Sequence, residues 1–144
     1  MQRLKLDKIL ICAAGGYVTN EAGELLVIFR RGIWDLPKGK MERNERPYEV
    51  ALREVFEETG IKDAAFAGEI GAAHFFDTYH SYKIGDQWKV KQTHWFKMTT
   101  KQTDFAPQLE EGIKEIKFVN ALDFIETEKN IHENIRTLIL VANA

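Results

Sequence analysis

The stretch 39–61, GKMERNERPYEVALREVFEETGI, decides how the rest of the chain is interpreted, because it carries more acidic side chains than packing or solubility requires. Pro47 suits the first turn of a helix, where no backbone N–H is needed, and Asn44 is a possible N-cap. Gly60 can adopt the left-handed conformation that often ends a helix. The sequence therefore predicts a short acidic helix between Asn44 and Gly60.

The predicted helix has two different faces. With about 100° between successive residues, the stripe predicted to face the core holds Tyr48, Leu52, Val55, Phe56 and Thr59. On roughly the opposite side, Glu54, Glu57 and Glu58 fall at i, i+3 and i+4, so three carboxylates crowd into one turn, where like charges repel. Arg53 offsets part of this charge through its i+4 partner Glu57, but one guanidinium cannot neutralise three carboxylates.

A divalent cation can neutralise this acidic turn. Hard oxygen ligands without Cys or His favour Mg²⁺ or Mn²⁺ over Zn²⁺. Mg²⁺ usually completes its coordination with water and with phosphate oxygens of a substrate, which points to phosphate chemistry. The alternative is a solvated acidic helix face, which is the usual meaning of an acidic helical sequence.

The spacing of the fixed residues favours the metal site over the solvated face. Gly39, then Glu45 after five residues, then REVFEETGI at 53–61 after seven more, match every fixed position of the Nudix box, G-x5-E-x7-R-E-U-x-E-E-x-G-U, with U aliphatic. The chain therefore resembles Nudix hydrolases. This resemblance implies the Nudix fold, an α/β/α sandwich with a mixed central sheet. It also implies Mg²⁺-dependent hydrolysis of a nucleoside diphosphate linked to another moiety.

Length and composition indicate a single globular domain over residues 1–144. The net charge of −2 offers no basic face for a nucleic acid duplex, whereas small anionic substrates remain possible. One cysteine excludes an internal disulfide and fits a reducing, cytoplasmic compartment. The apolar run near the N-terminus is interrupted by charges and too short to span a membrane, so no membrane partner is predicted. The sequence leaves the oligomeric state open.

Periodicity predicts strands on both sides of the acidic helix. Segments 8–18 and 24–30 are predicted to pair as a hairpin, with Gly15 and Gly16 at a bend or a close backbone approach. Segment 31–39 is predicted to be a loop. Further strands are predicted at 64–73, 74–83, 87–99 and 114–120, with an exposed loop at 101–112 and a closing helix at 129–141. This order predicts a mixed sheet covered on both faces, which agrees with the fold that the resemblance implies.

The resemblance assigns roles to the residues of the box. Glu54, Glu57 and Glu58 are expected to hold the metal ion, together with the backbone carbonyl of Gly39. Glu45 is expected to orient Arg53. Neither residue would bind the metal, and both would help to fix the geometry of the ligands. Alternatively, Glu45 is a solvated acid favoured by the dipole of the helix.

The general base is less clearly assigned, because Nudix enzymes do not all use the same carboxylate. Glu57 is the first candidate. Glu110 or Glu111, in the segment QLEEGIKE before the last strand, is the alternative, since relatives often bring a further acid from that loop.

Basic residues that lead into the box are candidates for phosphate contacts. Arg30 and Arg31 are adjacent on a predicted strand, so only one of them can face a cleft, while Lys38 and Lys40 flank Gly39. The segment WDLPKG at 34–39 resembles the W-x-L-P-K-G entry of Nudix enzymes that act on dinucleoside polyphosphates and diphosphoinositol polyphosphates. Relatives often carry His where this chain has Lys40. Lys38 is the first candidate.

Downstream segments extend the resemblance to the diadenosine-polyphosphate-hydrolase-like group. These segments are TYH at 78–80, THWF at 93–96 and QLEEGI at 108–113. Tyr79 and Trp95 are candidates for stacking on an adenine, although most aromatic residues in such strands belong to the core. The predicted substrate is a dinucleoside polyphosphate such as diadenosine tetraphosphate. ADP-ribose, a diphosphoinositol polyphosphate and a non-catalytic nucleotide-sensing module are the alternatives.

Overall fold

The computed structural model describes residues 9–42, 44–67, 76–108 and 112–144. The elements in chain order are β1 (Leu10–Thr19), β2 (Leu25–Arg30), β3 (Ile33–Asp35), β4 (Lys38–Lys40), α2 (Pro47–Thr59), β5 (Ala65–Phe66), β6 (Phe76–Ile84), β7 (Gln87–Thr99), β8 (Ile113–Val119), α3 (Ala121–Thr127) and α4 (Glu133–Ala142). None of the helices in the described ranges is long and apolar enough to cross a membrane.

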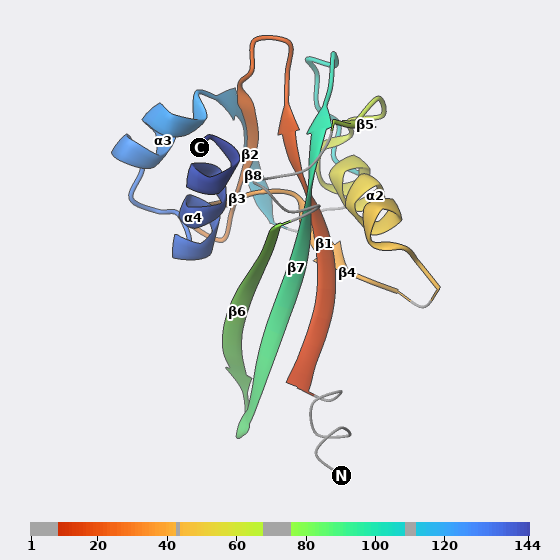
Figure 1. The fold of residues 1–144 in the computed structure, drawn as a ribbon, viewed down its shortest axis with the longest axis vertical. Coiled ribbons are helices and arrows are strands. Elements are labelled where there is room, and N and C mark those ends of the chain that lie inside the picture. The colour runs from red at the N-terminus through yellow and green to blue at the C-terminus, as the bar shows by residue number, and fades with distance from the viewer. Residues whose placement is uncertain (1–8, 43, 68–75, 109–111) are drawn as a thin grey trace.

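The described strands form one eight-stranded mixed sheet with β1 near its centre. β1 runs parallel to β7 from Leu10↔Val90 to Thr19↔Thr99, and antiparallel to β4 on its other side. β6 is antiparallel to β7, while β3 and β8 flank β2. Helix α2 covers one face of this sheet, and α3 and α4 lie on the other (Figure 1). The predicted α/β/α sandwich is confirmed.

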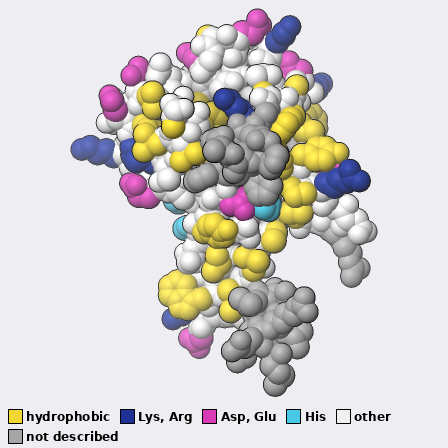
Figure 2. Space-filling view, viewed as in Figure 1, with side chains coloured by type: hydrophobic (Ala, Val, Ile, Leu, Met, Phe, Trp, Pro, Cys, Tyr) yellow, Lys and Arg dark blue, Asp and Glu magenta, His cyan; other side chains and the backbone are white. Residues whose placement is uncertain are grey.

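Each helical layer has its own hydrophobic cluster. On the α2 side, Val50, Ala51 and Val55 pack with Ala14 and Met98. On the other side, Trp34, Trp95 and Leu36 pack with residues of α3 and α4, such as Phe124 and Leu138. Strands β1, β6 and β7 extend beyond the helices, where the exposed apolar side chains include Leu10, Tyr79, Ile84 and Trp88 (Figures 1 and 2).

The predicted first hairpin is present, with β1 and β2 antiparallel, but its pairing is short. β1 and β2 pair only at Thr19↔Leu25, because β1 is occupied along its length by β7 and β4. Segment 31–39, predicted to be a loop, contains β3 and the first residues of β4. The close approach predicted at Gly15 is present, since a Cβ there would lie 2.5 Å from the carbonyl oxygen of Pro37. The sequence also did not predict α3.

Helix α2 has the predicted end and a different beginning. Gly60 adopts the left-handed conformation with φ 80°, and its N–H donates to the carbonyl of Phe56 at 2.8 Å. Pro47 occupies the first turn as predicted. The N-cap is Arg46, in an extended conformation, whereas Asn44 has φ 69° and lies outside the helix. Asn44 therefore serves the preceding turn, where a short polar side chain tolerates this conformation.

The buried stripe of α2 also differs from the predicted one. Tyr48 is 44% exposed and Leu52 is 37% exposed. The buried positions instead are Val50, Ala51, Glu54, Val55, Glu58 and Thr59. The helix is thus rotated relative to the expected apolar stripe, and two of its carboxylates face the interior. A carboxylate is tolerated there only when positive groups and hydrogen-bond donors surround it.

Candidate functional site

The most buried carboxylate of α2 is that of Glu58, whose residue is only 1% exposed. Its Oε2 accepts a hydrogen bond from Nη1 of Arg30 at 2.9 Å, and its Oε1 accepts one from the backbone N–H of Lys38 at 3.2 Å. Arg30 ends β2 and Lys38 begins β4, so two strands supply the partners of one helical side chain. These charge-assisted contacts offset the cost of burying the carboxylate.

Glu54 lies directly over Gly39. A Cβ added at Gly39 would be 2.1 Å from Cδ of Glu54, a distance that no real Cβ contact reaches. Glycine at this position therefore allows the carboxylate of α2 to approach the backbone of β4. This approach brings together two residues that the sequence analysis assigned to a metal site, a carboxylate ligand and the glycine.

Arg53 forms ion pairs with three carboxylates of the acidic cluster. Its Nε and Nη2 each donate to the carboxylate of Glu45 at 2.9 Å, a bidentate arrangement. Its Nη1 contacts Oε1 of Glu54 at 3.0 Å and Oε2 of Glu57 at 3.3 Å. The hydrogen bond from Arg53 keeps the pKa of Glu45 below its usual value, and the same bond raises the pKa of Arg53. The structure thus places Glu45 where the sequence analysis expected it to orient Arg53.

The donor chemistry of this cluster fits a hard divalent cation, but the three carboxylates are not assembled around one point. Glu54 and Glu58 line one pocket together with Gly39, whereas Glu57 is turned toward Arg53. In the described part of the chain, no group of three His, Cys, Asp or Glu residues is gathered closely enough to hold a metal ion. To complete a set of three carboxylate ligands, the side chain of Glu57 would have to break its ion pair with Arg53 and turn toward Glu54 and Glu58.

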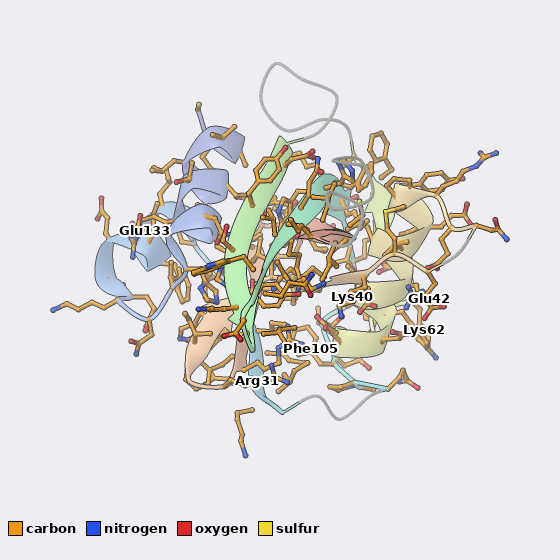
Figure 3. The ribbon with its side chains drawn as sticks, turned by 90° about the horizontal axis from the view of Figure 1, so that it is seen from below. Arg31, Lys40, Glu42, Lys62, Phe105 and Glu133 are labelled. Carbon is orange, nitrogen blue, oxygen red and sulfur yellow. The ribbon has the colours of Figure 1, made fainter. Side chains whose placement is uncertain are left out.

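Two pockets share several of their lining residues, and one of the two is lined by carboxylates of α2. The carboxylate pocket is lined by Gly39, Glu54, Glu58 and Lys40. The β6–α4 pocket is lined by Thr78, His80, Thr93, Trp95, His132 and Asn134. Arg30, Arg31, Lys38 and Lys91 line both pockets. Figure 3 shows Lys40 beside α2 and Glu133, at the start of α4, on the opposite side of the sheet. The two pockets therefore have four cationic residues in common.

The basic residues selected from the sequence line one or both of these pockets. Arg30 pairs with Glu58 and lies 3.9 Å from Asp35, while Nζ of Lys38 bonds to the carboxylate of Asp35. Lys40 is exposed at the edge of the carboxylate pocket. Arg31 lines both pockets despite being adjacent to Arg30, because its left-handed backbone, with φ 55°, breaks the alternation of a regular strand.

The two aromatic residues predicted as substrate contacts differ in their exposure to solvent. Trp95 is fully buried, and its Nε1 donates to the hydroxyl of Thr78 at 2.8 Å. Of the two interpretations given for Trp95, its burial in the core favours the structural one over stacking on a base. Tyr79 is 58% exposed but lines neither pocket, since it alternates with Thr78 and His80 along β6. Glu111, the alternative base, lies outside the described residues, as does Glu110.

The sequence analysis missed Lys91, which lies on β7 and reaches both pockets. Burial lowers its pKa below the usual 10.5, and the nearby cations Lys38 and Lys40 lower it further. Across the described residues, Lys91 has no carboxylate within ion-pair distance. His132 and Asn134, at the start of α4, were also missed. Nothing local marks these residues, because their proximity depends on the packing of β6, β7 and α4.

A sequence model of the NUDIX domain matches residues 11–139. The chain is 36% identical over 63 residues to an RNA pyrophosphohydrolase of Azorhizobium caulinodans, covering 40% of this chain and 34% of that protein. It is 30% identical over 97 residues to an 8-oxo-dGTP diphosphatase of Proteus vulgaris, covering 61% of this chain and 87% of that protein. The matched segments span about a third of the length of the first curated relatives.

The fold is similar to that of a C. elegans Ap4A hydrolase in a binary complex, with a TM-score of 0.64. That match covers 90% of this chain and 93% of the other at 18% sequence identity. Identity this low supports similarity of fold alone.

Proposed function

The chain belongs to the Nudix family, and from that membership we propose that it is a metal-dependent pyrophosphohydrolase that cleaves a phosphoanhydride bond in a nucleoside diphosphate-linked substrate. The observation that carries this proposal is the position of Glu54 over Gly39, beside Glu58 and the cations Arg30 and Lys38. Carboxylates next to cations can hold a divalent metal and a phosphate chain side by side. A non-catalytic nucleotide sensor would usually have lost one of the box carboxylates.

Each residue of the site has a part in the proposed hydrolysis. Glu54, Glu57 and Glu58 would hold Mg²⁺ or Mn²⁺ with the carbonyl of Gly39, and the bound ion supplies positive charge and lowers the pKa of water. Glu57 accepts the proton of the attacking water as general base. The water oxygen forms a bond to phosphorus, the bond from phosphorus to the bridging oxygen breaks, and the leaving phosphate carries the negative charge. Arg30 and Lys38 stabilise this charge.

The proposed substrate is a dinucleoside polyphosphate such as diadenosine tetraphosphate. The cations shared by the two pockets support this choice, because a four-phosphate bridge presents more oxygens to them than the two phosphates of ADP-ribose. The names of the relatives point to other substrates, 8-oxo-dGTP and RNA. A diphosphoinositol polyphosphate is a further alternative. We propose that the protein acts in the cytoplasm.

Steady-state kinetics with Mg²⁺ tests the substrate. We expect a higher kcat/KM for diadenosine tetraphosphate than for ADP-ribose or 8-oxo-dGTP, with asymmetric cleavage into ATP and AMP. Lys38→Ala should lower kcat/KM more for the tetraphosphate than for ADP-ribose, because Lys38 contacts the longer bridge. Lys62→Ala, at an exposed position outside both pockets, is the control. A preference for ADP-ribose or 8-oxo-dGTP in the wild type contradicts the proposed substrate.

The lowered pKa of Lys91 predicts that KM for the substrate depends on pH. Because its pKa is lowered by burial and by neighbouring cations, its ammonium group loses its proton at a lower pH than an ordinary lysine. The uncharged amine binds phosphate more weakly, so KM for the tetraphosphate should rise as pH increases from neutral toward that pKa. Lys91→Met should raise KM at neutral pH and remove this rise. An identical pH profile of KM in wild type and Lys91→Met would show that Lys91 does not contact the phosphates.

A further inference from the structure

The turn between β2 and β3 holds an arginine in the left-handed region of the backbone. Arg30 and Ile33 pair across the two strands, so Arg31 and Gly32 form a two-residue loop. Both loop residues have positive φ, 55° at Arg31 and 79° at Gly32, as in a type I′ turn. Asn, Asp or Gly usually occupies the first of these two positions, because a larger side chain is strained there. Arginine at this position therefore destabilises the turn, and strain of this kind is typical of functional sites.

The guanidinium of Arg31 differs from two neighbouring cations in its surroundings. Arg30 pairs with Glu58 at 2.9 Å, and Lys38 pairs with Asp35. Arg31 is exposed at the edge of both pockets. In the part of the chain that the structure describes, no carboxylate lies within ion-pair distance of it. Its charge is therefore available to an anion that enters from solvent.

The two adjacent arginines also differ in their position relative to the proposed metal ligands. Arg30 contacts Glu58 directly. Arg31 lines the same pocket as Glu54 and Glu58, yet it forms an ion pair with neither of them within the described ranges. Arg30 is therefore the arginine next to the proposed metal ligands, and Arg31 lies further from their carboxylates.

We infer that Arg31 determines which length of phosphate bridge the protein selects, by binding a phosphate beyond those next to the metal ligands. The inference rests on the proposed function, because the metal ligands fix where the bridge begins. A guanidinium presents a fork of N–H donors that matches phosphate oxygens. A bridge of four phosphates reaches this fork, whereas a bridge of two phosphates ends before it. The strained conformation of Arg31 thus lowers the stability of the turn and serves substrate selection.

Calorimetry with two ligands that share both adenosines and differ in the length of the bridge tests the inference. The ligands are analogues of diadenosine tetraphosphate and diadenosine diphosphate with methylene groups in place of the bridging oxygens between phosphorus atoms, which resist hydrolysis in the presence of Mg²⁺. Arg31→Asn should raise Kd for the tetraphosphate analogue about 10-fold, the effect of losing one hydrogen bond to a charged group. Kd for the diphosphate analogue should stay nearly unchanged. Arg31→Lys, which keeps the charge without the fork, should raise Kd for the tetraphosphate analogue less than Arg31→Asn does.

Urea unfolding separates substrate selection from folding. Because Asn suits the left-handed conformation, Arg31→Asn should unfold at the same urea concentration as the wild type or at a higher one. Arg46→Asn is the matched control. It also removes an exposed arginine, at the N-cap of α2, where Asn is favoured, and Arg46 lines neither pocket. This control should leave both dissociation constants unchanged.

Three results would overturn the inference. They are an unchanged Kd for the tetraphosphate analogue in Arg31→Asn, equal rises in Kd for the two analogues, and the same rise in Arg46→Asn. Equal rises together with a lower unfolding midpoint would assign Arg31 a structural role instead. Hydrolysis of unmodified substrates with Mg²⁺ is measured separately, so that any of these results in a wild type that hydrolyses a phosphoanhydride leaves the proposed function intact. Absence of hydrolysis for every phosphoanhydride substrate would count against the proposed function, whatever the two dissociation constants.

Discussion

Glu58→Ala is expected to lower the free energy of unfolding by about 3 kcal/mol, because it removes one partner of a buried ion pair. The side chain of Glu58 is 1% exposed, and its carboxylate accepts from Arg30 at 2.9 Å and from the backbone N–H of Lys38 at 3.2 Å. Without it, the guanidinium of Arg30 loses a contact of 2.9 Å, whereas its contact with Asp35 spans 3.9 Å. Urea unfolding of the wild type and the variant measures the difference.

Glu57→Ala is the matched control for this loss of stability. Glu57 lies on the same helix, but its side chain is 25% exposed and its pair with Arg53 spans 3.3 Å. Exposed pairs of this kind contribute about 1 kcal/mol or less. If Glu58→Ala and Glu57→Ala unfold at the same urea concentration, the pair between Glu58 and Arg30 does not stabilise the fold. A double replacement, Arg30→Met with Glu58→Leu, should recover much of the loss, because no charge is then left buried alone.

The acidic helix shows which part of the site local sequence determines. The spacing of Glu54, Glu57 and Glu58 places them on one turn whatever surrounds the helix, and Pro47 and Gly60 mark its ends through their own backbone preferences. These features were predicted because they depend on neighbouring residues alone. The burial of Glu58 depends on Arg30, 28 positions away in the chain, so helical periodicity could not reveal it.

The same distinction explains the errors in the sheet and the pockets. The apolar stripe of α2 was predicted to face the core. In the structure, Tyr48 and Leu52 of that stripe are exposed, whereas Glu54 and Glu58 face β4 and β2. Trp95 was a candidate for stacking on a base, yet it is buried in the cluster between the sheet and α4. Lys91 and Asn134 belong to elements far apart in the chain, and the β6–α4 pocket exists only after those elements pack.

Glu57→Gln is expected to preserve the fold and to lower kcat by about 10²- to 10⁴-fold, the share that a general base usually supplies. Glu57 is the most exposed of the three box carboxylates, and its contacts among the described ion pairs are with Arg53 alone. It can therefore exchange Arg53 for water or metal without disturbing the buried pair of Glu58. Steady-state kinetics with diadenosine tetraphosphate measures the loss, and urea unfolding confirms that the fold is kept.

Comparison with Glu111→Gln decides which carboxylate is the base. Metal binding must be measured in both variants by calorimetry, since losing a ligand and losing a base both lower kcat. One Mg²⁺ ion bound only to the native state should add about 2.7 kcal/mol to stability at 100 times its dissociation constant, so the unfolding midpoint reports the same binding. If Glu57 is the base and not an indispensable ligand, Glu57→Gln keeps this shift while kcat falls. A larger fall in kcat for Glu111→Gln than for Glu57→Gln, with Mg²⁺ binding retained in both, assigns the base to Glu111.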